Sequence, residues 1–256
     1  MLASLILPTI LGLLGAIVGS FLALVSVRLP LGEDVVLTPS HCRACQVRLA
    51  PWRMIPIVSW FWSRGRCDGC KAAVSPRYPL IETAAAAIGV WAALTGDSLL
   101  MTAVTAILGW QLLLIAIVDA EHFWLPDILT WPLGLSGLVA AALISQGPPW
   151  PQIIGLVAGG ACLWGFAALY KAVRKRDGLG GGDPFLFAAA GAWVGFMGLT
   201  SVLLYACVAG FAVVAAKLIV RRVISGSDRL PFGSFLAIGV WLTWLYGPVG
   251  LMASGL

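Results

Sequence analysis

Two carboxylates in this sequence adjoin long apolar runs, and they are the residues best placed for acid–base chemistry. Asp119 follows the apolar run that begins at Leu99, and Asp183 lies between three glycines (180–182) and another apolar run. A charge within the bilayer costs roughly 2.5–3.5 kcal/mol on insertion scales, so such groups usually have a function. Two carboxyl groups that approach closely cannot both ionise, and one then serves as base while the other donates a proton. Such a pair can hydrolyse a peptide bond.

The residues around these carboxylates suit an active-site loop. Gly180 and Gly182 permit close approach of another backbone or of a substrate peptide. Pro126 breaks or starts a helix, and Asp127 directly follows it. We therefore expect these four residues to surround a catalytic pair formed by Asp119 and Asp183.

Helix capping is the alternative interpretation of the same carboxylates. Asp183 precedes Pro184, which is the order of an N-cap residue followed by proline at the first helical position. Asp127 stands at the first turn of an apolar segment, where its charge suits the helix dipole. Asp119 ends an apolar segment, where a negative charge opposes the dipole, so capping does not explain it. For Asp183, spacing alone leaves both alternatives open.

Four cysteines in the polar segment have the spacing of a metal site. Cys42 and Cys45 form one CxxC pair, Cys67 and Cys70 form a second, and 21 residues separate the pairs. Four thiolates in two such knuckles hold one tetrahedral Zn²⁺ and leave no open position for water. We therefore predict a structural Zn²⁺ that supplies much of the folding energy of this small segment.

Other cysteine chemistry is also compatible with the sequence. The four thiols could form two disulfides, although a cytoplasmic, reducing location would disfavour them. His41 adjoins Cys42 and could compete as a ligand. Cys162 and Cys207 lie inside apolar runs, where packing is the ordinary role of cysteine.

The composition determines which elements position these groups. The chain has 256 residues, of which 60% are hydrophobic and 11% charged, whereas soluble domains carry about 25% charged residues. We therefore predict an all-α polytopic membrane protein. Stretches of about 20 apolar residues cross a bilayer, which gives about eight spans. They are Leu2–Val27, Leu80–Leu94, Leu99–Val118, Ile128–Ile144, Ile153–Tyr170, Pro184–Gly198, Ser201–Val220 and Phe232–Tyr246.

The basic residues predict the orientation of these spans. All 16 Lys and Arg residues lie in three regions, 28–77, 171–176 and 217–229, and alternate loops contain none. Because basic loops stay in the cytoplasm, we expect all three regions, and the zinc-ribbon-like insert, on that side. Asp119 then ends an inward span and Asp183 begins an outward one, both at the cytoplasmic face. A nucleic-acid-binding surface would not explain the alternation, so we expect no nucleic-acid partner.

Several motifs resemble those of the bacterial type IV prepilin peptidases, which are leader peptidases and N-methyltransferases. The similarity runs from about Gly19 to Gly247. Besides the cysteine pairs, it rests on motifs in the first part of the chain: Gly-Ser-Phe-Leu (19–22) with Arg-Leu-Pro (28–30), IPIVSW (55–60), RGRC (64–67) and SPRYPLIE (75–82). It also rests on the two carboxylate motifs, Asp119 with Leu-Pro-Asp (125–127) and Gly-Gly-Gly-Asp (180–183). The second of these is similar to the GxGD signature of intramembrane aspartyl proteases. Ala23, Gln46 and Pro184-Phe185 depart from the family pattern, which typically has a lysine two positions after the second aspartate.

The resemblance implies a bacterial inner-membrane enzyme whose catalytic pair is Asp119 and Asp183. Its substrates would be prepilins and pseudopilins, and its second activity would methylate the new N-terminus with S-adenosyl-L-methionine. No sequence motif identifies the residues that bind this cofactor. The implied organisation is a first transmembrane helix (1–28), a zinc-binding insert associated with methylation (29–79) and a peptidase domain (80–256).

Two other functions are compatible with parts of the sequence. A proton- or cation-coupled transporter would also carry intramembrane carboxylates, but internal repeats are usual in transporters and none is visible here. A non-catalytic assembly scaffold would use the aspartates only as helix caps.

Overall fold

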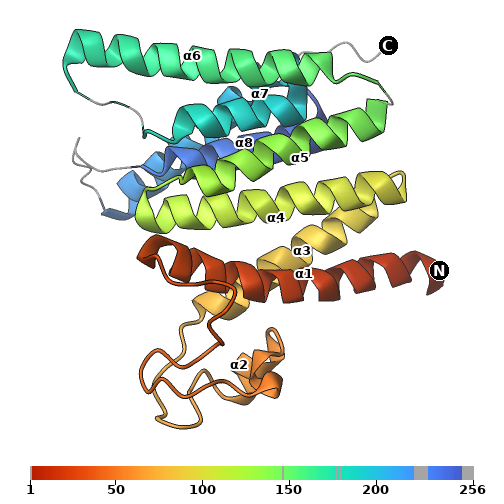
Figure 1. The fold of residues 1–256 in the computed structure, drawn as a ribbon, viewed down its shortest axis with the longest axis vertical. Coiled ribbons are helices and arrows are strands. Elements are labelled where there is room, and N and C mark those ends of the chain that lie inside the picture. The colour runs from red at the N-terminus through yellow and green to blue at the C-terminus, as the bar shows by residue number, and fades with distance from the viewer. Residues whose placement is uncertain (1, 146, 177, 179, 222–229, 250–256) are drawn as a thin grey trace. The chain divides into compact units, whose positions relative to one another are not determined.

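The computed structural model describes residues 2–145, 147–176, 178, 180–221 and 230–249, and their regular structure is helical. Within these ranges, the only β-type pairs are two isolated bridges, in the insert. The helices are α1 (Leu2–Arg28), α2 (Val58–Trp62), α3 (Arg77–Thr95), α4 (Leu99–His122), α5 (Asp127–Ser145), α6 (Trp150–Arg174), α7 (Asp183–Arg221) and α8 (Phe232–Tyr246), with short 3₁₀ turns η1 (Leu29–Leu31) and η2 (Pro51–Met54) (Figure 1).

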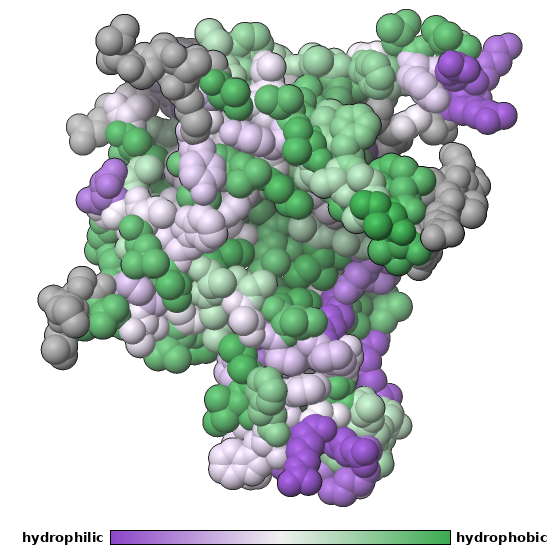
Figure 2. All heavy atoms as spheres, turned by 180° about the vertical axis from the view of Figure 1, so that it is seen from behind, coloured by the Kyte–Doolittle hydropathy of each residue, from purple (hydrophilic) through white to green (hydrophobic). Residues whose placement is uncertain are grey.

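Six of these helices are long and apolar enough to cross a membrane: α1, α3, α4, α5, α6 and α7. The polytopic helical architecture is therefore confirmed. Of the eight expected spans, the sixth and seventh are the two parts of the 39-residue α7, and the eighth is the shorter apolar helix α8. The exposed surface of the helices is largely hydrophobic (Figure 2), as a lipid-facing surface requires.

The chain divides into two compact units, residues 1–110 and 111–256. In the first unit, α1 packs closely against α3, because Gly15 and Gly89 leave no side chain between the two backbones. At one end of this pair, the Arg77 guanidinium donates hydrogen bonds to the Ala23 carbonyl oxygen (3.2 Å) and the Ser26 hydroxyl (2.7 Å). The start of α3 is thus fixed to the end of α1.

The insert between α1 and α3 is folded around a buried arginine. Arg28 is the last residue of α1 and is 4% exposed. Its guanidinium donates to the carbonyl oxygens of Asp34 (2.9 Å), Thr38 (2.7 Å) and Pro39 (3.0 Å). These bonds turn the chain back from the helix end toward the cysteine pairs. Beyond Arg28, the insert has almost no core, because only Gly65 and Cys67 are buried among residues 29–76.

In the second unit, α7 is bent sharply at one glycine. Gly195 has φ +68° and ψ +176°, a conformation that residues with a side chain rarely adopt. The bend divides α7 into a shorter first part and a longer second part that runs back alongside it (Figure 1). Gly155 of α6 and Gly191 of α7 bring these two helices into backbone contact. The end of α4 and the starts of α5, α7 and α8 lie together at one end of the unit, where Gly182 and Gly233 approach Leu125.

Candidate active site and metal centre

Asp119 is buried in the last turn of α4 and is held by the start of α8. Asp119 is only 5% exposed. The backbone N–H of Ser234 donates to Asp119 Oδ2 at 2.6 Å, and the Ser234 hydroxyl lies 3.0 Å from the same oxygen. Because Ser234 is in the first turn of α8, the positive end of that helix dipole faces the carboxylate. This contact compensates for the unfavourable position of Asp119 at the end of α4.

Asp183 is the first residue of α7 and is 4% exposed. Its Oδ2 accepts the backbone N–H of Gly180 at 2.9 Å, and its own N–H donates to the Gly180 carbonyl oxygen at 3.2 Å. The side chain is therefore bonded to the glycine loop before the helix rather than to the first-turn amides that an N-cap would bind. This geometry favours the functional interpretation of Asp183 over the capping one.

The two aspartates are brought to the same small region by Leu125. A side chain at Gly182, which precedes Asp183, would lie 2.5 Å from Leu125 Cβ. A side chain at Gly233 would lie 2.5 Å from Leu125 Cδ1 and 3.1 Å from the carboxyl carbon of Asp119. The absence of these side chains lets the three segments that carry Asp119, Asp183 and Ser234 meet around Leu125. Two buried carboxyls in this arrangement can act as a general acid–base pair.

The other loop residues predicted from the sequence lie in different environments. Gly180 and Gly182 belong to the loop that touches Asp183 and Leu125. Pro126 is buried directly after Leu125, and its carbonyl oxygen accepts the N–H of Leu129 in the first turn of α5. Asp127 is exposed at the start of α5, where its charge suits the helix dipole.

The four predicted cysteine ligands form a single cluster in the first unit. Their sulfurs all lie within 4.8 Å of one another, and the Cys42–Cys70 and Cys45–Cys67 distances are both 3.9 Å. A tetrahedral Zn²⁺ with Zn–S bonds of about 2.3 Å needs S···S distances of about 3.8 Å. A disulfide would need a separation of about 2.05 Å. The cluster could therefore hold a metal ion, and it contains no disulfide.

The two CxxC pairs have the same backbone fold, which explains the convergence of their sulfurs. In the first, Cys42 N–H donates to the Val47 carbonyl oxygen (2.9 Å); in the second, Cys67 N–H donates to that of Ala72 (2.9 Å). Gln46 and Lys71 occupy equivalent positions and both have φ +59°. Backbone N–H groups of Cys45 and Ala44 lower the pKa of the Cys42 thiol to about 6, which favours the thiolate that a metal binds.

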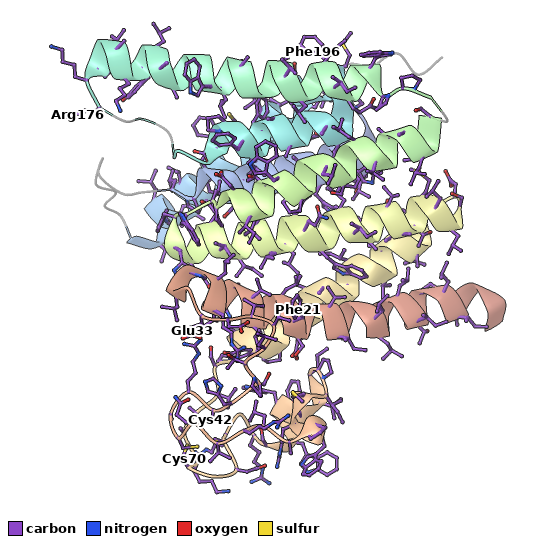
Figure 3. The ribbon with its side chains drawn as sticks, viewed as in Figure 1. Phe21, Glu33, Cys42, Cys70, Arg176 and Phe196 are labelled. Carbon is purple, nitrogen blue, oxygen red and sulfur yellow. The ribbon has the colours of Figure 1, made fainter. Side chains whose placement is uncertain are left out.

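His41, the alternative metal ligand, is engaged in other contacts. Its Nδ1 lies 3.0 Å from the Pro39 carbonyl oxygen, and its backbone pairs with Arg48. Figure 3 shows Cys42 and Cys70 at the end of the insert that lies away from the helices of the first unit. The cysteine cluster therefore lies in the part of the insert that is distant from these helices.

Comparison with known proteins identifies the family. Residues 13–95 match the bacterial peptidase A24 N-terminal domain, and residues 106–215 match the type IV leader peptidase family. A prepilin leader peptidase/N-methyltransferase from Pseudomonas aeruginosa is 34% identical over 258 residues, covering 92% of this chain and 89% of the relative. Proteins of the same name from Dichelobacter nodosus (92% and 90% covered) and Aeromonas salmonicida (84% and 73% covered) are 35% and 36% identical. The chain belongs to the type IV leader peptidase family.

This membership makes the chain a multi-pass membrane peptidase, and none of the matches supports a transporter. No solved structure matches the chain. Both aspartates lie within residues 106–215, the part that matches the type IV leader peptidase family. The cysteine cluster lies within the part that matches the N-terminal domain.

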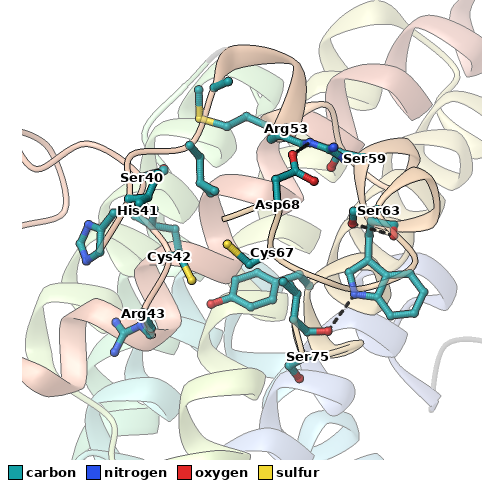
Figure 4. A pocket seen from close by; sticks show the side chains of 18 of the residues that line it. Ser40, His41, Cys42, Arg43, Arg53, Ser59, Ser63, Cys67, Asp68 and Ser75 are labelled. Carbon is teal, nitrogen blue, oxygen red and sulfur yellow. Dashed lines mark hydrogen bonds and ion pairs between the residues drawn. The ribbon is translucent and has the colours of Figure 1, made fainter. Parts of the chain in front are cut away.

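A pocket beside the cysteine cluster adds a second candidate site to this leader peptidase. Its volume is about 770 Å³, and residues of the insert, α1 and α3 line it (Figure 4). Its walls include the Trp60 and Tyr78 rings and the Glu82 carboxylate. Arg53, paired with Asp68 at 2.5 Å, lies on one side (Figure 4). The volume is within the range of small-molecule sites in proteins.

Three residues of these sites were not predicted from the sequence. Ser234 and Gly233 are far from Asp119 in the sequence, although the predicted topology did place the start of the eighth span at the same membrane face. Glu82 is buried at 6% exposure, and its Oε2 accepts the Ile57 N–H at 2.6 Å. A carboxylate inside the second predicted span was a signal that could have identified it.

We predict that the Ser234 hydroxyl positions Asp119 for catalysis. The Ser234→Ala variant keeps the backbone N–H bond but removes the hydroxyl, which also lies 2.9 Å from the Ala116 carbonyl oxygen. A net hydrogen bond to a charged group contributes about 1.5–3 kcal/mol, so we expect kcat for leader cleavage to fall about tenfold or more, with KM unchanged. Ser234→Thr retains a hydroxyl and should recover most of kcat. An equal loss in both variants, or a change confined to KM, would contradict this role.

Proposed function

We propose that this chain is an aspartic endopeptidase that removes the leader from prepilins and pseudopilins, with Asp119 and Asp183 as its catalytic residues. The observation that supports this most strongly is that the segments carrying two buried aspartates meet around Leu125, within a chain of the type IV leader peptidase family. Its relatives are named prepilin leader peptidases.

The chemistry follows from the shared environment of the pair. At close range, one carboxyl is ionised and the other protonated, and the two titrate as a unit. The ionised group removes a proton from water as the water attacks the scissile carbonyl carbon. The protonated group donates to the carbonyl oxygen, and proton transfer to the leaving nitrogen completes peptide-bond cleavage. The glycine loop (180–182) leaves room for the substrate backbone beside Asp183.

The proposed orientation places this reaction at the cytoplasmic face of the bacterial inner membrane. Both aspartates lie at the end of the second unit where α4 ends and α7 and α8 begin. The basic regions 171–176 and 217–229 precede the starts of α7 and α8, which supports a cytoplasmic location by the positive-inside rule. A substrate whose hydrophobic segment spans the bilayer would present its leader junction at this depth.

We further propose that the pocket of the insert binds S-adenosyl-L-methionine for N-methylation. The lining residues fit the chemistry of this molecule. Trp60 and Tyr78 offer aromatic faces for an adenine, Glu82 offers a carboxylate for a sulfonium cation, and Arg53 offers a guanidinium for the amino-acid carboxylate. When bound, the cofactor supplies an electrophilic methyl group. The four cysteines, which would hold Zn²⁺, keep the walls of the pocket folded.

These assignments give the organisation of the chain. We propose that 1–28 is the first transmembrane helix, 29–79 is the zinc-binding insert with the methylation site, and 80–256 carries the peptidase. The positions of the candidate groups in the sequence support this division. The cysteines and the pocket residues precede residue 83, and the two aspartates follow residue 110.

Mass spectrometry of a prepilin incubated with the purified enzyme tests both activities. With S-adenosyl-L-methionine present, we expect a shortened product that carries one added methyl group at its N-terminus. Without the cofactor, we expect the shortened product alone. A prepilin that stays intact under both conditions would refute the peptidase proposal, and a cleaved but unmethylated product would refute only the second activity.

A further inference from the structure

The segment from Trp52 to Trp62 exposes an unusual concentration of large apolar side chains. Between Met54 and Ser63 it contains no charged residue. Six of its side chains are exposed, by 44% to 81%: Trp52, Met54, Ile55, Val58, Phe61 and Trp62. Contiguous apolar surfaces of this kind mark interaction sites, whereas scattered exposed residues do not.

The opposite side of the same segment is fixed to the rest of the insert. The indole N–H of Trp60 donates to the Val74 carbonyl oxygen at 3.0 Å, and the Trp60 ring packs against Gly65. The inner face of the segment thus packs against the rest of the insert, whereas its outer face is exposed.

A buried carboxylate fixes the depth of this segment along the helices of its unit. Glu82 Oε2 accepts the N–H of Ile57, the residue that precedes α2. Glu82 is the sixth residue of α3, so it lies roughly 7.5 Å along that helix from its start. Ile57 is the centre of a γ-turn with φ +64° and ψ −59°, in which Val58 N–H donates to the Pro56 carbonyl oxygen. The chain therefore adopts a strained turn that keeps α2 level with the first turns of a membrane span.

We propose that the outer face of residues 52–62 is an interfacial anchor that inserts into the lipid headgroup and acyl boundary beside α1 and α3. Tryptophan and phenylalanine are the side chains most suited to this boundary. Arg64, which is exposed and lies just after the segment, can contact lipid phosphates. The anchor holds one wall of the insert at the membrane, since Trp60 and Glu82 also line its pocket. This inference does not depend on the peptidase assignment.

Depth-dependent fluorescence quenching tests the proposal with the full chain in vesicles. An environment-sensitive fluorescent amino acid is introduced by codon suppression at Phe61, which is 66% exposed and therefore tolerant of replacement. The matched control carries the same amino acid at Val47, which is 56% exposed but belongs to a cysteine knuckle. Zinc content verifies that both variants are folded. The vesicles contain phosphatidylglycerol and phosphatidylcholine, with nitroxide groups placed near the headgroup or deep in the acyl chain.

We expect the headgroup-level nitroxide to quench the probe at position 61 at least about twofold more than the probe at 47, and more than the deep nitroxide does. Equal quenching at the two positions would overturn the proposal. The proposal would also be overturned if nitroxide lipids did not quench position 61 but an added prepilin shielded it from an aqueous quencher. That outcome would make the surface a protein-docking site.

Discussion

Replacing Asp119 or Asp183 with asparagine should abolish leader cleavage while leaving the protein folded. General acid–base catalysis contributes about 10²–10⁴ to a rate, so each variant should lose at least about a hundredfold in kcat. Asparagine has the shape of aspartate and can still accept the bonds from Ser234 or Gly180. The loss would therefore report on proton transfer rather than on packing. Cleavage of a purified prepilin in detergent, followed by mass spectrometry, measures it.

The matched control for these variants is Asp97→Asn. Asp97 is an exposed carboxylate between α3 and α4, outside both candidate sites, and its replacement makes the same chemical change. Its kcat should equal that of the parent protein. The double variant Asp119→Asn with Asp183→Asn should be no worse than either single variant, because residues that act as a unit are not additive. Normal cleavage by both single variants would exclude this pair as the catalytic residues.

The parts of the fold that depend on local composition could be predicted from the sequence. Apolar stretches such as Leu99–Val118 identify spans because the bilayer requires about 20 apolar residues in a row. The CxxC spacing predicts a metal site because each pair directs two sulfurs to one point, and the four sulfurs do form one cluster. Counting spans predicted that Asp119 and Asp183 lie at the same end of the helix bundle, and the segments that carry them do meet at Leu125.

Contacts between distant segments could not be predicted in this way. The bonds of Ser234 to Asp119 cross more than a hundred residues of sequence, and topology gives the end of the unit but not the neighbour. The bond between Glu82 and Ile57 requires a positive φ at a β-branched residue, which local propensity disfavours. The joining of the sixth and seventh spans into α7 depends on how the chain bends at Gly195.

The insert is held by a few polar interactions rather than by a hydrophobic core. Only Gly65 and Cys67 are buried among its residues 29–76, so it has no hydrophobic core to offset its conformational entropy. Gln46 and Lys71 also adopt left-handed conformations that favour glycine, which adds strain to both knuckles. Arg28 fixes the start of the insert, and Glu82 fixes the turn before α2. The part that holds the cysteines must be stabilised by something else, and a bound metal is the candidate.

Replacing Cys42 or Cys67 with serine should therefore remove about one zinc per chain and unfold the metal-binding part of the insert. Structural zinc contributes about 10–16 kcal/mol of apparent binding energy in small domains, far more than the few contacts here can replace. We expect the insert to become sensitive to protease and N-methylation to be lost. Leader cleavage should persist, because Asp119 and Asp183 belong to the other compact unit. Atomic absorption, limited proteolysis and product masses measure these three effects.

The control is Cys207→Ser, which changes a cysteine that is exposed on α7 and lies outside the cluster. Its zinc content, protease resistance and methylation should match those of the parent protein. A chelator should reproduce the Cys42→Ser result in the parent protein, since it removes the same ion without a substitution. If Cys42→Ser retained its zinc, the four-cysteine centre would not be the metal site. If zinc were lost but methylation continued, the pocket walls would fold without the metal. The proposed dependence of methylation on zinc would then be wrong.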